Sequence, residues 1–257
     1  MYFTDTHTHL YVSEFDEDRD EIVRKAIDEG IKKMVLPGIH SIYIPMQKQL
    51  TERYPENCFL AFGLHPSDVK EGFEDEIEIV KNNLQTGNAV AVGEIGIDLY
   101  WDKTFAEQQK NAFEKQVILA KEYKLPVIIH VREAFDEVFE IVDKLNDKNL
   151  KGIFHSFTGT PEQAEKIINY GGFKIGINGI VTFKNSGLDK VVKGIDLKNI
   201  VLETDSPYLS PVPKRGKRNE SSHLIYIAEK VAEIKDISLK ELAEITNDNA
   251  VKIFGSL

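Results

Sequence analysis

The sequence predicts a (β/α)8 barrel, also called a TIM barrel, an α/β fold in which eight parallel strands alternate with helices. Short apolar runs rich in β-branched residues recur along the whole chain, and an amphipathic or polar stretch follows each of them. Eight such runs in 257 residues match the usual length of one closed barrel. No internal repeat, low-complexity tract or linker interrupts this alternation. We therefore expect one barrel domain that spans residues 1–257.

The apolar runs give the predicted strands in order. They are expected at residues 2–6, 33–37, 59–64, 89–95, 127–130, 152–155, 173–177 and 200–203. An open doubly wound sheet is the alternative, but it would ordinarily carry a glycine-rich phosphate loop after its first strand. The segment from His7 to His9 stands there instead, so we favour the barrel.

The segments between the strands carry helix signals of their own. Apolar and small residues return near the 3.6-residue period across residues 105–123, which predicts an outer helix of the barrel. A capping box with proline at the first helical position begins at Thr160, and a second capping box begins at Ser238. We expect a helix to start at each of them.

Composition and charge exclude several classes of protein. Hydrophobic residues make up 42% of the chain and charged residues 29%, and the mean hydropathy is −0.28, which excludes a membrane-embedded or disordered chain. The single cysteine, Cys58, excludes a disulfide scaffold and indicates a reducing compartment. With no signal peptide or apolar span, the expected location is the cytoplasm. The net charge of −10 requires that a polyanionic substrate be attracted by local cations.

Ionisable side chains recur where the predicted strands end. The carboxyl ends of the strands form the active-site face of a barrel, so side chains that follow different strands should meet there. His7 and His9 are two residues apart and face the same side of a strand, and such a pair can bind one ion. The residues expected at this rim are His7, His9, His65, Glu94, His130, His155 and Asp205.

This set of residue types predicts a divalent-metal site. Imidazole and carboxylate ligands together suit Zn²⁺ or Mn²⁺, and they leave the identity of the metal open, Mg²⁺ included. Four histidines and two carboxylates exceed what one catalytic ion uses, so we expect two ions about 3.5–4 Å apart, with Glu94 as the bridging carboxylate. Asp5 and Glu203 lie one step further in on their strands and are expected to support the ligands.

Five short sequence motifs, which follow one another in a fixed order along the chain, are the ones that resemble a known family. They are DTHTHL at residues 5–10, GEIGID at 93–98, HSFTG at 155–159, LETDSP at 202–207 and RGKRNE at 215–220. Over nearly the whole chain, these motifs resemble the TatD family of metal-dependent hydrolases. Two positions depart from the family pattern: Tyr11 stands where an aspartate is usual, and Ser221 stands where a proline is usual.

The resemblance implies a TIM barrel with a divalent-metal site and a hydrolase activity that in several members is nucleolytic, on DNA. It also implies a division of the ligands between two ions. One ion is assigned to His7, His9, Glu94 and Asp205, and the other to Glu94, His130 and His155.

The expected chemistry is hydrolysis of a phosphodiester bond by a hydroxide formed from water between two ions. The expected catalytic residues are Glu94, Asp205 and His65. His65 is also expected to bind substrate, together with Lys214, Arg215 and Arg218, which form a basic cluster with Lys217. The predicted substrate is DNA, cut from single-stranded or frayed ends, and no feature indicates an obligate protein partner.

Several alternatives remain open from the sequence. The same activated water would hydrolyse an ester or amide, such as an aminoacyl-tRNA bond or a small cyclic amide. A partner-binding barrel with structural metals ranks last, because a core of this size folds without metal. Tyr100 and Trp101 could stack on an unpaired base or pack against neighbouring loops, and His40 matches no motif.

Overall fold

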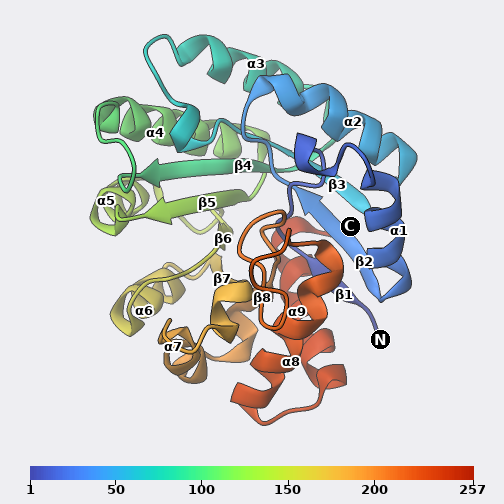
Figure 1. Ribbon diagram of the computed structural model, residues 1–257. Helices are drawn as coiled ribbons and strands as arrows, with labels where there is room; N and C mark the ends of the chain where they lie inside the picture. The colour runs from blue at the N-terminus through green and yellow to red at the C-terminus, as the bar shows by residue number, and fades with distance from the viewer.

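The computed structural model describes residues 1–257 and contains one eight-stranded parallel sheet (Figure 1). Neighbouring strands in the sheet follow the chain order from β1 to β8. The bounds are β1 Phe3–Asp5, β2 Ile31–Leu36, β3 Cys58–Phe62, β4 Ala89–Asp98, β5 Val127–Arg132, β6 Gly152–Phe154, β7 Phe173–Ile177 and β8 Ile200–Leu202. This order confirms the predicted barrel and excludes the doubly wound sheet, in which the strand order reverses.

Backbone contacts bring the last strand against the first. The Thr6 N–H donates to the Leu202 carbonyl at 3.1 Å, and a parallel bridge joins Thr8 to Ser206 just beyond the two strands. The two chain segments that follow β1 and β8 therefore run side by side.

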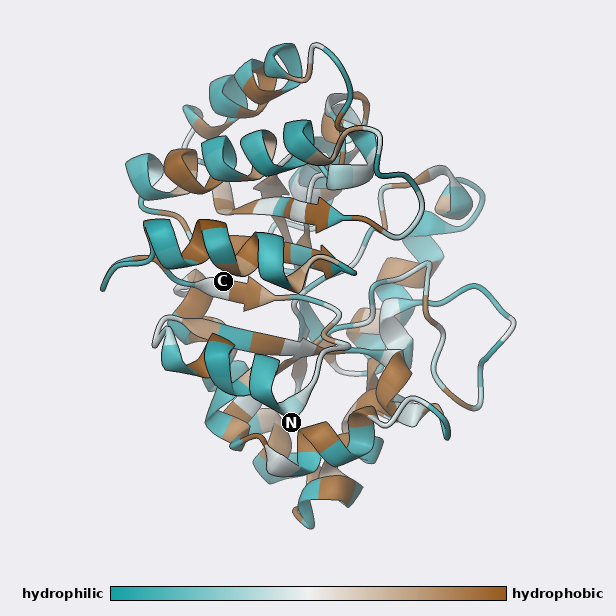
Figure 2. Ribbon diagram, turned by 90° about the vertical axis from the view of Figure 1, so that its left-hand side faces the viewer, coloured by the Kyte–Doolittle hydropathy of each residue, from teal (hydrophilic) through white to brown (hydrophobic).

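Helices cover the outside of the sheet (Figure 1). Their bounds are α1 Arg19–Asp28, α2 Ile44–Arg53, α3 Glu74–Leu84, α4 Ala106–Tyr123, α5 Phe135–Leu145, α6 Pro161–Asn169, α7 Leu188–Gly194, α8 Leu224–Lys235 and α9 Leu239–Phe254. The helix predicted at residues 105–123 is α4. Thr160 and Ser238 cap α6 and α9 as predicted. Hydrophobic and hydrophilic segments alternate along the helices in Figure 2, as amphipathic helices require.

The fourth strand is longer than the sequence predicts. The predicted strand stops at residue 95, where its apolar run ends. In the structure, β4 continues to pair with β5 as far as Asp98 and Arg132. Gly96 has a φ of 143°, and a Cβ at this position would collide with the His130 carbonyl. Glycine therefore lets the two strands approach closely, and the extension carries Asp98 to the rim beside His130.

Apolar side chains from six strands, which precede the last residue of each strand, pack against the carboxyl-terminal end of α9. Val35, Ala61, Ala91 and Ile128 form one buried cluster, against which Phe254 packs, and Ile153, Val201 and Ile253 form another. Both clusters therefore join the strands to the end of α9. No helix of the chain is both long and apolar enough to cross a membrane.

Candidate metal centre

The carboxyl ends of the strands bring four histidines and two carboxylates together, and we call this set the histidine cluster. Its members are His7, His9, Glu94, His130, His155 and Asp205. They lie within or directly after β1, β4, β5, β6 and β8. Five of the six are buried, whereas the side chain of His130 is 17% exposed. The structure thus brings together the residues that the sequence predicts at this rim.

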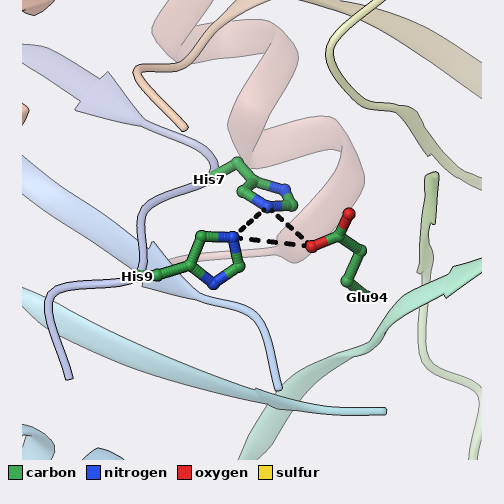
Figure 3. Close-up of side chains that lie close together, drawn as sticks. All are labelled: His7, His9 and Glu94. Carbon is green, nitrogen blue, oxygen red and sulfur yellow. Dashed lines mark hydrogen bonds and ion pairs between the residues drawn. The ribbon is translucent and has the colours of Figure 1, made fainter. Parts of the chain in front are cut away.

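Glu94 lies at the centre of the cluster, and its two carboxylate oxygens face different histidines. Its Oε2 lies 3.1 Å from His7 Nε2 and 3.5 Å from His9 Nε2, as Figure 3 shows. Its Oε1 lies 2.8 Å from His130 Nδ1 and 2.8 Å from His155 Nε2. One side chain therefore divides the nitrogen ligands into two groups.

The first group contains His7, His9 and Asp205. The Nε2 atoms of the two histidines are 3.0 Å apart, and Asp205 Oδ1 lies 3.7 Å and 3.4 Å from them. Asp205 has a φ of 58°, in the left-handed region, and its N–H donates to the His7 carbonyl at 2.9 Å. The link between the segments after β1 and β8 thus holds this carboxylate in place, in a conformation that is common at functional sites.

The second group contains His130 and His155, with His65 beside them. His65 Nε2 lies 3.3 Å from Glu94 Oε1 and 3.4 Å from His130 Nδ1. The Nδ1 of His65 accepts the Ser67 N–H at 3.1 Å, so the proton of the neutral ring is on Nε2. His65 therefore presents a hydrogen-bond donor to the centre.

The outer nitrogens of three imidazoles face acceptors, as metal-binding histidines usually do. His130 Nε2 lies 3.0 Å from Asp98 Oδ2, and His155 Nδ1 lies 3.4 Å from Glu203 Oε1. His9 Nδ1 lies 2.8 Å from the hydroxyl of Tyr11.

These partners fix which ring nitrogen carries the proton. The Tyr11 hydroxyl donates to the Pro37 carbonyl, so it accepts from His9, and the two carboxylates can only accept. When these rings are neutral, as metal ligation requires, their unprotonated nitrogen points at Glu94 or its neighbours. This donor set fits divalent cations.

Two of the supporting carboxylates differ from the sequence expectation. Asp98 had no predicted role, because the predicted strand stops at residue 95, short of the rim. Asp5 bonds mainly to Thr204, accepting from its N–H at 2.9 Å and from its hydroxyl at 2.7 Å, so it anchors the segment that leads to Asp205. Burial raises the pKa of Asp5 to about 7.

A glycine on the neighbouring strand leaves the space that the Glu203 carboxylate occupies. A Cβ at Gly176 in β7 would collide with Glu203 Oε2. Glu203 Oε1 also accepts the Ser156 N–H, so the carboxylate holds both His155 and the backbone that follows it.

Burial and charge act against each other on the ionisable groups of the cluster. Burial alone would raise the pKa of Glu94, but attraction to His155, His65 and His7 lowers it well below its ordinary range. Burial and the repulsion of His155 lower the pKa of His7. For His155, burial is outweighed by Glu94 and Glu203, which raise its pKa well above the ordinary value. The centre thus holds its carboxylates ionised among imidazoles.

The basic residues after β8 differ in the contacts that their side chains make. Arg218 pairs with both carboxylate oxygens of Asp18, at 2.9 and 2.6 Å, and donates to the Glu14 carbonyl at 2.6 Å. Lys214 Nζ lies 5.7 Å from the ring of Tyr226. The Arg215 guanidinium lies 4.0 Å from the Phe183 ring centroid.

Arg215 and Lys217 are exposed, and their side chains make no ion pair. Phosphate contact by Arg218 would compete with its existing partners. Arg215 and Lys217 are therefore the cations of this loop that are open to a ligand.

Two other histidines lie outside the centre. His40 Nδ1 accepts the Ile42 N–H at 3.3 Å and lies 3.7 Å from Glu76. His223 is buried and bonds through Nδ1 to Asn219 at 3.0 Å. Neither belongs to the histidine cluster.

Comparisons with known proteins agree with this geometry. A family model described as TatD related DNase matches residues 4–255. The chain is 38% identical to the uncharacterized metal-dependent hydrolase YabD of Bacillus subtilis, over 97% of this chain and 98% of YabD. It is 32% identical to the 3'-5' ssDNA/RNA exonuclease TatD of Citrobacter rodentium, over 98% of this chain and 97% of that protein. The crystal structure of YJJV, a TatD homolog from Escherichia coli, matches with a TM-score of 0.92 at 29% identity, covering 98% and 97% of the two chains.

Proposed function

Because the chain belongs to the TatD family of metal-dependent hydrolases, we propose that it is a nuclease that removes nucleotides from single-stranded or frayed DNA ends. The Citrobacter relative is named as a 3'-5' exonuclease on ssDNA and RNA, and this name supports the same substrate class. The observation that carries the proposal is the position of Glu94, with one oxygen in each of two groups of nitrogen ligands.

Two divalent ions fit this arrangement. His7, His9 and Asp205 would hold one ion together with Glu94 Oε2, and His130 and His155 would hold the other with Glu94 Oε1. The imidazole-rich set favours Zn²⁺ or Mn²⁺ over Mg²⁺. When bound, such ions make water acidic near neutral pH and neutralise the charge that develops on a phosphoryl group.

Asp205 is the residue that we assign to proton transfer. Its side chain is 12% exposed, against 3% for Glu94, so substrate and water reach it more easily. Burial would raise its pKa, but contact with His9 and attraction to the neighbouring imidazoles lower it. Asp205 is therefore ionised, and it accepts the proton of the attacking water.

His65 is the residue that we assign to the phosphate oxygens. Its Nε2–H faces the centre, and its side chain is 16% exposed, so an oxygen of the substrate can reach this donor. A donor at this position stabilises the negative charge that grows on oxygen during the reaction.

The cations after β8 supply the attraction that the net charge of −10 does not. Arg215 and Lys217 are exposed and make no ion pair, so they are the contacts that we favour for phosphate, with Lys214 beside them. Charges beyond a Debye length of about 8 Å are screened at physiological salt, so local cations outweigh distant carboxylates.

An end-labelled oligonucleotide assay tests this proposal. Single-stranded, frayed and blunt duplex DNA, labelled at either end, would be incubated with Mn²⁺, Mg²⁺ or Zn²⁺. We expect metal-dependent shortening of the single-stranded and frayed forms, lost in Asp205→Asn and unchanged in His40→Gln. No shortening of any form, together with hydrolysis of an ester or amide, would instead support the alternative hydrolase. Arg215→Ala should raise KM for oligonucleotides and leave a small neutral ester unaffected.

A further inference from the structure

Two aromatic residues after β4 remain open to solvent at the rim of the barrel. Trp101, the chain's single tryptophan, is 76% exposed, and Tyr100 is 45% exposed. Their rings meet edge to face, with centroids 4.7 Å apart. Such exposure contradicts the hypothesis that both rings pack against neighbouring loops. Apolar surface that a barrel leaves in water beside its active site indicates a ligand contact.

Arg132, at the end of β5, lies against both rings. Its guanidinium carbon is 3.9 Å from the centroid of Tyr100 and 5.5 Å from that of Trp101. The guanidinium makes no hydrogen bond or ion pair within the protein. Stacking thus holds the three side chains in place, while the N–H groups of Arg132 stay available to an acceptor such as phosphate.

Asp98 ties this aromatic group to the histidine cluster. Its Oδ1 accepts the Tyr100 N–H at 3.0 Å, and its Oδ2 faces His130 Nε2 at 3.0 Å. Asp98 also pairs in register with Arg132 across β4 and β5. The aromatic rings therefore begin two residues from a carboxylate that contacts a histidine of the second ligand group.

We propose that Tyr100, Trp101 and Arg132 form a subsite that stacks the unpaired base next to the bond being cut, with Trp101 as the stacking surface. This inference rests on the proposed nuclease function and names what the site selects. Every base has an aromatic face, so stacking on Trp101 accepts any sequence. A base inside a duplex is already stacked on its neighbours, so the subsite favours single-stranded or frayed ends over blunt duplex.

The fluorescence of Trp101 gives a test that does not depend on turnover. Metal-loaded protein would be titrated with a phosphorothioate octathymidylate, which resists hydrolysis, and with an abasic phosphorothioate oligomer of the same length. Stacking predicts that the octathymidylate quenches the tryptophan emission and that the abasic oligomer leaves it nearly unchanged. Equal quenching by both oligomers, or none by either, would overturn the proposal.

Steady-state kinetics on single-stranded DNA give the second test. Trp101→Ala should raise KM about tenfold, within the range measured for loss of one base stack, and leave kcat within about twofold. Trp101→Phe should restore most of the affinity, because it keeps an aromatic face. Tyr2→Ala is the matched control, since Tyr2 is 43% exposed and precedes β1 at the opposite end of the barrel.

The outcomes separate this inference from the proposed function. An active nuclease whose KM is the same with Trp101 and with alanine would disprove the subsite alone. Absence of nuclease activity on all DNA forms would disprove the proposed function, and the subsite as a part of it, whatever the fluorescence.

Discussion

The two ends of the barrel interior differ in chemistry although the same strands build both. On β5 and β6, Ile128 and Ile153 precede His130 and His155 by two residues, and side chains two residues apart share a strand face. The isoleucines lie in the apolar clusters that pack against α9, whereas the histidines face Glu94. One step of about 6.6 Å along a strand thus separates packing from chemistry.

Stability and reactivity therefore depend on different residues of the same strands. The apolar end loses stability when its packing is disturbed, while the histidine end depends on the placement of charge and protons. Variants at the apolar end should therefore leave activity unchanged, and variants at the histidine end should leave stability unchanged. This expectation is general for TIM barrels, whose active sites lie at the carboxyl ends of the strands.

Replacing Glu94 by glutamine should give the largest effect on activity. The amide keeps the shape of the side chain, but it removes the charge that both groups of histidines face. We expect kcat/KM on single-stranded DNA to fall about 10³-fold or more, because charge stabilisation by metal ions is worth several kcal/mol. Glu76→Gln, which alters the carboxylate that faces His40, is the control. Activity within tenfold of wild type would contradict the central place of Glu94.

Replacing Ile253 by alanine should give the converse result. Ile253 is 2% exposed and packs with Ile153 and Val201 under the barrel. Urea unfolding should show a loss of about 2–5 kcal/mol, and Ile253→Val should lose about 0.5–1.5 kcal/mol. Activity per folded molecule should stay at the wild-type value in both variants. A fall in activity without a loss of stability would break the separation of the two ends.

Changes at Glu203 or at Gly176 should have a smaller effect, on metal affinity. Glu203→Gln weakens the acceptor for His155 Nδ1, and Gly176→Ala forces the carboxylate to move. We expect a 10- to 100-fold loss of metal affinity in either variant, measured by competition with a chelating dye. Gly194→Ala is the matched control, because nothing lies within 4 Å of a Cβ there. Wild-type affinity in both variants would show that His155 is oriented by other contacts.

The pH dependence of stability should reveal the smallest effect, at His223. Burial lowers the pKa of His223 to about 4, below the value of about 6.5 expected in an unfolded chain. The folded state therefore favours the neutral ring, and its contribution to stability is complete above pH 6.5 and is lost as the pH falls towards 4. His223→Gln should reduce the loss of unfolding free energy between pH 7 and pH 4.5. The same loss in wild type and variant would disprove this role.

The placement of the histidine cluster could be predicted from the sequence because it depends on strand order and parity. His130 and His155 end apolar runs, so their depth in the barrel follows from the count of strands. The role of Asp98 could not be predicted, since it depends on Gly96 carrying β4 past the end of its apolar run.

Which of the basic residues after β8 form ion pairs also could not be predicted from the sequence. Arg218 pairs with Asp18, which lies 200 residues earlier in the chain, and only the fold brings the two together. The proton positions on the histidines likewise depend on distant partners, such as Glu203 for His155. The assignment of individual ligands to metal ions, and the cytoplasmic location, stay predictions.

The number of metal ions bound per chain shows whether Glu94 is shared between two metal sites. Wild-type protein and Glu94→Ala would be loaded with Mn²⁺, freed of excess ion by gel filtration and measured by elemental analysis, with Glu76→Ala as control. We expect two ions per chain in wild type and control, and none or nearly none in Glu94→Ala, because this carboxylate contacts both groups of histidines. Two ions retained without Glu94, or no ion in the wild-type protein, would contradict this expectation.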